Sequence, residues 1–169
     1  ALFLFIIIKV RNIKVQTDKL ALKLYLLMGF FSFTVPFAFV YWAQSFIPSG
    51  LSSILFATYP FFVILFTKMF FKEEEVNKFK IIGSLVGFAG IVIIFSKNLQ
   101  FNFGQGIIGY FVVVFSALLQ GMVAVLIKKH GKKLNPVSMN LIPVFIAGIV
   151  LSILGLLIED TTKLKFDSN

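Results

Sequence analysis

The side chains in this sequence that could bind a ligand are mostly polar and uncharged. They lie within long apolar runs. Ser116 and Gln120 are four residues apart, so in a helix they share one face. Amides and hydroxyls in apolar surroundings form hydrogen bonds to a polar ligand or to another helix, and an aromatic residue such as Tyr41 can instead anchor a helix at a membrane surface. The candidate ligand-binding residues are Tyr41, Gln44, Thr58, Tyr59, Pro60, Ser116, Gln120 and Asn140.

Catalytic and metal chemistry have few candidates. The sequence has no cysteine and a single histidine, His130, so neither a thiolate nucleophile nor a multi-histidine metal site is expected. The acidic run 73–75 stands among lysines, which is typical of a solvated loop, and acids there also suit the start of the next helix. We therefore expect no metal and no cofactor.

The composition identifies the surroundings of these side chains. Of the 169 residues, 59% are hydrophobic and 14% are charged, and the net charge is +9. A soluble domain has roughly 45–50% apolar and about 25% charged residues. The positive charge alone would suggest a nucleic-acid partner, but the apolar excess indicates a lipid bilayer instead.

Uncharged runs predict where the chain crosses the bilayer. The run 24–67 is too long for one span of about 20 residues, and Pro48-Ser49-Gly50 provides a turn within it. Continuous apolar runs favour helices, because the strands of a membrane barrel alternate in polarity. We predict an all-α polytopic membrane bundle with spans near 24–43, 51–71, 79–97, 106–127 and 136–158.

The flanking segments complete this map. The apolar stretch 1–8 is too short to span a bilayer, and we expect it to be the end of a truncated membrane helix. Asn77 and Asn135 are expected to cap the helices that follow them, and Pro136 suits the first turn. Residues 159–169 form a predicted external tail.

Basic residues predict the orientation. Nearly all of the 16 Lys and Arg residues lie in loops on one side of the predicted membrane. By the positive-inside rule the loops 9–23, 68–80 and 128–135 are cytoplasmic, in a plasma or inner membrane. The net charge of +9 is therefore a consequence of topology.

Proline residues interrupt three of the predicted spans. A proline inside a helix cannot donate to the carbonyl four residues earlier, and its ring crowds that carbonyl. In transporters such broken helices often line a substrate site, although membrane helices also tolerate proline as a simple kink. The prolines are Pro36, Pro60 and Pro143, and the carbonyls concerned are those of Ser32, Phe56 and Met139.

Glycine residues form a small-residue face on the third complete span. Gly83, Gly87 and Gly90 follow helical spacing, which permits close approach of another helix. We expect this face to pack within one subunit, and a homodimer interface is the alternative.

Residues 43–95 carry a family resemblance. They read AQSFIPSGLSSILFATYPFFVILFTKMFFKEEEVNKFKIIGSLVGFAGIVIIF. A short turn, a helix with a central proline at Pro60, and Glu74 nine residues before Gly83 resemble the EamA-type branch of the drug/metabolite transporter superfamily. The cytoplasmic turn departs from the family pattern, since Glu73 replaces the usual glycine and Asn77 the usual threonine.

The resemblance implies ten helices in two inverted five-helix repeats around a central cavity. Residues 1–97 would belong to the first repeat and 98–169 would begin the second. It also implies a transporter that exports a small polar metabolite, amino-acid-like or otherwise neutral or zwitterionic, by alternating access. No charged side chain stands in the middle of a predicted span, so this part of the sequence offers no candidate for proton coupling.

Two other functions fit a polytopic membrane protein. An intramembrane lipid-modifying enzyme would have to use the acids 73–75 or His130, which have no partner motif. A non-transporting membrane scaffold would need no polar cavity.

Overall fold

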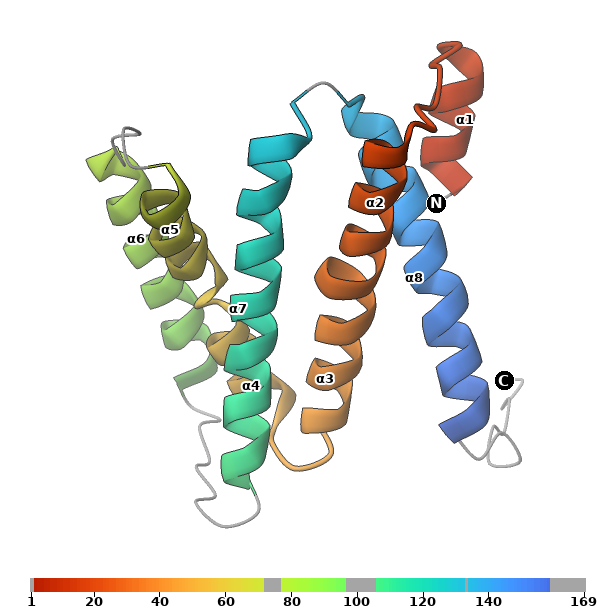
Figure 1. The fold of residues 1–169 in the computed structure, drawn as a ribbon. Helices are drawn as coiled ribbons and strands as arrows, with labels where there is room; N and C mark the ends of the chain where they lie inside the picture. The colour runs from red at the N-terminus through yellow and green to blue at the C-terminus, as the bar shows by residue number, and fades with distance from the viewer. Residues whose placement is uncertain (1, 72–76, 97–105, 133, 159–169) are drawn as a thin grey trace.

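The computed structural model describes residues 2–71, 77–96, 106–132 and 134–158. All regular elements in these ranges are helices, which confirms the predicted all-α class (Figure 1). In chain order they are α1 (Leu2–Val10), α2 (Lys19–Leu27), the π-helix η1 (Met28–Thr34), α3 (Val35–Ala43), α4 (Ser49–Phe56), α5 (Tyr59–Phe70), α6 (Lys78–Phe95), α7 (Gly106–His130) and α8 (Pro136–Ile158).

Five helical segments in the described ranges are long and apolar enough to cross a membrane. They overlap the five spans predicted from the uncharged runs. Two of them combine several elements, since α2, η1 and α3 form one continuous segment and α4 with α5 form another. The five segments are Lys19–Ala43, Ser49–Phe70, Lys78–Phe95, Gly106–His130 and Pro136–Leu157.

Local sequence signals begin these helices as predicted. The Asn77 side chain accepts a hydrogen bond from the Phe79 amide at 2.9 Å, and Asn135 accepts one from the Val137 amide at 2.9 Å. Before α2, Asn12 has a φ of 47°, a left-handed conformation that asparagine tolerates better than most residues. The helix starts at Asn77 and Asn135 and the turn at Asn12 are therefore set by residues that are close in sequence.

Pro36 changes the type of helix rather than ending it. The π-helix η1 precedes it, and the Val35 amide donates to the carbonyl of Phe30, five residues earlier. The Thr34 hydroxyl also donates to the Gly29 carbonyl, at 2.8 Å. The wider turn therefore relieves the crowding that the proline ring causes in an α-helix.

Pro60 breaks its helix, whereas Pro143 does not. The helix α4 ends at Phe56, the residue whose carbonyl the Pro60 ring would meet, and α5 resumes at Tyr59. At the break the Thr58 hydroxyl donates to the Leu55 carbonyl at 2.6 Å. Pro143 lies buried inside the continuous helix α8.

The helix α7 lies at the centre of the bundle, with α4, α5 and α6 on one side and α3 and α8 on the other (Figure 1). It contacts α3, α4, α5 and η1 through a face of small and β-branched residues. A Cβ added to Gly121 would lie 2.9 Å from the Phe62 Cβ, and one added to Gly109 would lie 3.4 Å from the Ala43 carbonyl oxygen. Glycine at these positions allows α7 to approach α5 and α3 closely.

The predicted glycine face of α6 is open in the described structure. No heavy atom lies within 4 Å of a Cβ built on Gly83, Gly87 or Gly90. Among the described residues, the main contacts of α6 are with α4 and α5. The packing of another helix against the glycine face of α6 therefore stays a prediction.

Two glycine-to-alanine substitutions test the close approach of α7. Gly121→Ala should lower the Tm of the purified protein, because the new methyl group meets the Phe62 Cβ and the Val63 backbone, and overpacking costs about 1–3 kcal/mol. The matched control is Gly148→Ala in α8, where the added Cβ meets no atom within 4 Å. Alanine exceeds glycine in helix propensity by about 1 kcal/mol, so this variant should keep or raise the Tm. Equal shifts of the Tm in both variants would contradict the close approach of α7 to α5 at Gly121.

Candidate functional site

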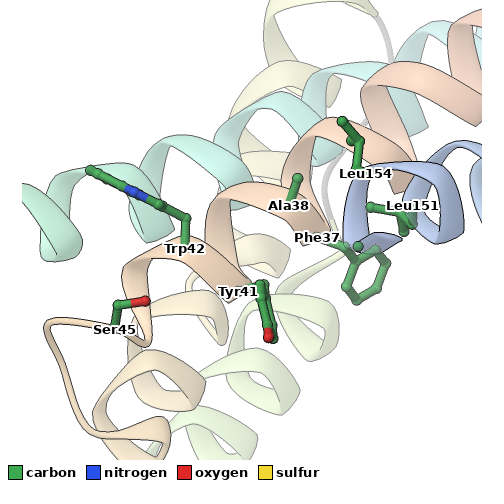
Figure 2. Close-up of a pocket in the computed structure, with 8 residues that line it drawn as sticks. Phe37, Ala38, Tyr41, Trp42, Ser45, Leu151 and Leu154 are labelled. Atoms are coloured by element: carbon green, nitrogen blue, oxygen red, sulfur yellow. The ribbon is translucent and has the colours of Figure 1, made fainter. Parts of the chain in front are cut away.

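An uncharged groove of about 550 Å³ lies between α3 and α8. Its α3 wall consists of residues at helical spacing, so one face of the helix supplies hydroxyl, indole and aromatic groups. Figure 2 shows Phe37 of α3 beside Leu151 of α8, with Tyr41 one turn farther along α3. The lining residues are Phe37, Ala38, Tyr41, Trp42, Ser45, Leu151, Leu154 and Gly155.

The chemistry of this groove suits an uncharged or zwitterionic guest. None of its described lining residues carries a formal charge, and Tyr41, Trp42 and Ser45 provide hydrogen-bonding groups. The Tyr41 side chain is 64% exposed, so its ring can meet a guest. Of the eight candidates, Tyr41 is the one that this groove contains.

A second opening, of about 350 Å³, lies beside the broken helix. Tyr59 and Pro60 line it together with Gly83 and Gly87 of α6. Thr58 stands at the break, but its hydroxyl bonds to the Leu55 carbonyl. The structure thus brings two candidate residues next to two of the predicted packing glycines.

Gln120 makes a hydrogen bond between two helices that are distant in sequence. Its Nε2 donates to the Ser32 carbonyl oxygen at 2.6 Å, joining α7 to η1. This carbonyl is the one to which Pro36 cannot donate. Ser116, one turn away and fully buried, donates to its own helix at the Val112 carbonyl. In the structure Gln120 therefore makes an interhelical hydrogen bond, one of the two roles expected for it.

The remaining candidates lie elsewhere. Asn140 lines a cleft between α7 and α8, and its Nδ2 donates to the Pro136 carbonyl at 2.8 Å. Gln44 is exposed at the end of α3. Glu74 lies outside the described residues. The eight candidates are thus distributed over several surroundings, and their contact with a substrate stays a prediction.

The sequence analysis missed the glycines that make the close helix contacts. Gly29 faces the Pro143 carbonyl and Ile146 of α8, and Gly121 faces α5. A signal for Gly121 was present, because Ala117 and Gly121 form a small-xxx-small pair beside Gln120. Among the described residues, no cluster of three or more His, Cys, Asp and Glu side chains has a geometry suited to a metal ion.

The helices define a multi-pass α-helical membrane protein. The chain belongs to the EamA-like transporter family, whose sequence profile matches residues 1–96. This confirms the resemblance carried by residues 43–95.

Three curated relatives are similar to the chain, and two of them carry the name uncharacterized transporter. The chain is 26% identical over 156 residues to the uncharacterized transporter YoaV of Bacillus subtilis, covering 92% of this chain and 53% of the relative. It is 25% identical over 134 residues to an uncharacterized transporter of Buchnera aphidicola, covering 78% and 44%. Protein PagO of Salmonella typhimurium is 24% identical over 132 residues, covering 76% and 42%. The chain spans about half the length of these relatives, and no solved structure matches it.

The bond between Gln120 and Ser32 predicts a difference between two glutamines. Gln120→Met should lower the free energy of unfolding by about 1 kcal/mol, because it removes the donor to a carbonyl inside the bundle. Gln44→Met is the matched control at an exposed helix end and should have a smaller effect. Reversible unfolding in mixed micelles measures both. If Gln44→Met lowers the free energy of unfolding as much as Gln120→Met does, the hydrogen bond between Gln120 and the Ser32 carbonyl contributes no net stability.

Proposed function

We propose that this chain forms part of a transporter that exports a small neutral or zwitterionic solute, such as an amino-acid-like metabolite, by alternating access. The observation that carries the proposal is the uncharged groove between α3 and α8, in which Tyr41, Trp42 and Ser45 offer polar groups beside an apolar wall. Membership of the EamA-like transporter family supports transport as the activity.

The uncharged lining favours the solute class. An ionic guest in apolar surroundings needs an opposite charge, which the described groove residues do not provide. A zwitterion can be held by hydroxyl and indole groups together with water, and its apolar part can meet Phe37 and Leu151. A coupling ion would then bind outside this groove.

The irregular helices support movement during a transport cycle. The break at Ala57 and Thr58 divides one membrane segment into α4 and α5, and η1 widens another. Discontinuous helices in transporters often lie beside the substrate path, where their backbone groups can rearrange. We infer that residues 1–97 belong to the first of two inverted repeats and that 98–169 begin the second.

Labelling of single cysteines tests the proposed orientation. The 169 residues contain no cysteine, so each introduced thiol can be followed by itself. A membrane-impermeant maleimide should label Ser49→Cys in intact cells, and should label Lys14→Cys only after permeabilisation, because the loop 9–23 is proposed to be cytoplasmic. The reverse pattern would invert the topology.

Solute flux tests the groove in the full-length protein. Tyr41→Ala should reduce flux by about fivefold or more at matched expression, since an aromatic contact contributes about 1 kcal/mol. Gln120→Ala should also reduce flux, and a Tm measurement separates loss of a solute contact from loss of the bond to the Ser32 carbonyl.

Two further variants sharpen the flux experiment. Tyr41→Phe separates the hydroxyl from the ring, and Phe145→Ala removes an exposed aromatic side chain of α8 that does not line the groove. Flux should stay near wild type in Phe145→Ala. Unchanged flux in both Tyr41→Ala and Gln120→Ala would exclude these residues from the solute path.

A further inference from the structure

A basic cleft lies at the end of the bundle opposite to the groove. It has a volume of about 350 Å³ and opens where α7 ends and α8 begins, at the top of Figure 1. Lys128, Lys132 and Asn140 provide its polar groups. Its apolar surface includes Met28 and Met139, so the cleft combines cationic groups with a hydrophobic wall.

The electrostatics of the cleft favour an anion. Two lysines line it and none of its described lining residues is acidic. The Lys128 Nζ lies 5.1 Å from the centre of the Phe71 ring at the end of α5, so this cation–π contact turns its ammonium group toward α5, on the other side of α7 from α8. Lys132 is exposed beside it. A negative head group in the cleft would therefore meet the charge of Lys132, and Lys128 would add positive potential from the α5 side of α7.

The end of α7 would ordinarily oppose an anion, because a helix carries partial negative charge at its C-terminus. Here one of the last four carbonyls of α7, that of Ile127, is already bonded. The Gly131 amide donates to the Ile127 carbonyl at 2.7 Å, and the Leu134 amide donates to the Gly131 carbonyl at 2.9 Å. The His130 Nδ1 lies 3.0 Å from the Leu126 carbonyl oxygen. The bond to the Ile127 carbonyl offsets part of the negative potential that the helix end presents to the cleft.

The depth of the cleft points to a lipid as the source of the anion. Lys128 is in the last turn of a helix long enough to cross the membrane, so it lies at the level of lipid head groups. Other basic residues, including Lys14 and Lys80, stand in segments at the same end of the bundle. Basic pockets between membrane helices bind anionic head groups in this way.

We propose that this cleft binds the phosphate head group of an anionic glycerophospholipid. Lys132 contacts the phosphate, Asn140 contacts a hydroxyl of the head group, and the methionine-lined wall contacts the first part of the acyl chains. The site is separate from the groove between α3 and α8, so its occupancy does not depend on the identity of the transported solute.

Native mass spectrometry of the purified full chain tests the proposal. The probes are phosphatidylglycerol and phosphatidylcholine with the same acyl chains. The wild-type chain should retain phosphatidylglycerol preferentially, and Lys132→Gln should weaken its binding by about fivefold, the contribution expected of one lysine near a membrane surface. Lys132→Arg, which keeps the charge, should restore binding.

A matched variant distinguishes lipid binding in the cleft from general attraction between an anionic lipid and a basic protein surface. Lys80→Gln makes the same charge change at an exposed position of α6, outside the cleft, and should weaken binding by less than twofold. Equal losses in Lys80→Gln and Lys132→Gln would overturn the site, as would the absence of any preference for phosphatidylglycerol. Inorganic phosphate that binds as tightly as the lipid would show a site for a soluble anion, and the lipid assignment would be wrong.

Discussion

The contact of α7 with its neighbours on both sides is the interaction on which the rest of the bundle depends. Gly121 allows the helix to approach the backbone of α5, and Gln120, the preceding residue, donates to the Ser32 carbonyl of η1. One short stretch of α7 therefore joins the α4–α5 segment to the α2–α3 segment. In a bilayer the hydrophobic effect adds little between helices, so close packing and such hydrogen bonds have to hold them together.

The same constraint explains how the three prolines are accommodated. Inside a membrane, backbone groups that lose their helical partner have to find another one within the protein. At Pro36 the helix widens, and Thr34 and Gln120 bond to carbonyls of the widened turn. At Pro60 the helix separates into two pieces, and Thr58 bonds back to α4. Pro143 is simply buried within α8.

The two ends of the bundle differ in chemistry, and the two proposed ligands follow from this difference. The groove between α3 and α8 is uncharged and aromatic, which fits a solute that leaves water only in part. The cleft between α7 and α8 is basic and lies at head-group depth, which fits a fixed membrane component. Since α8 forms a wall of both, a change in its position would alter both sites.

The sequence alone determined the all-α membrane class, the five spans and the capping roles of Asn77 and Asn135, because these depend on runs of apolar residues and on contacts over a few positions. It also carried the family, through the pattern around Pro60. Only the tertiary structure decided which candidates lie together. Gln120 donates to the Ser32 carbonyl, 88 positions away, whereas Tyr41 lines the groove and Gln120 does not. Such contacts depend on how helices rotate and approach one another, which for α7 is set by glycines whose neighbours are distant in sequence.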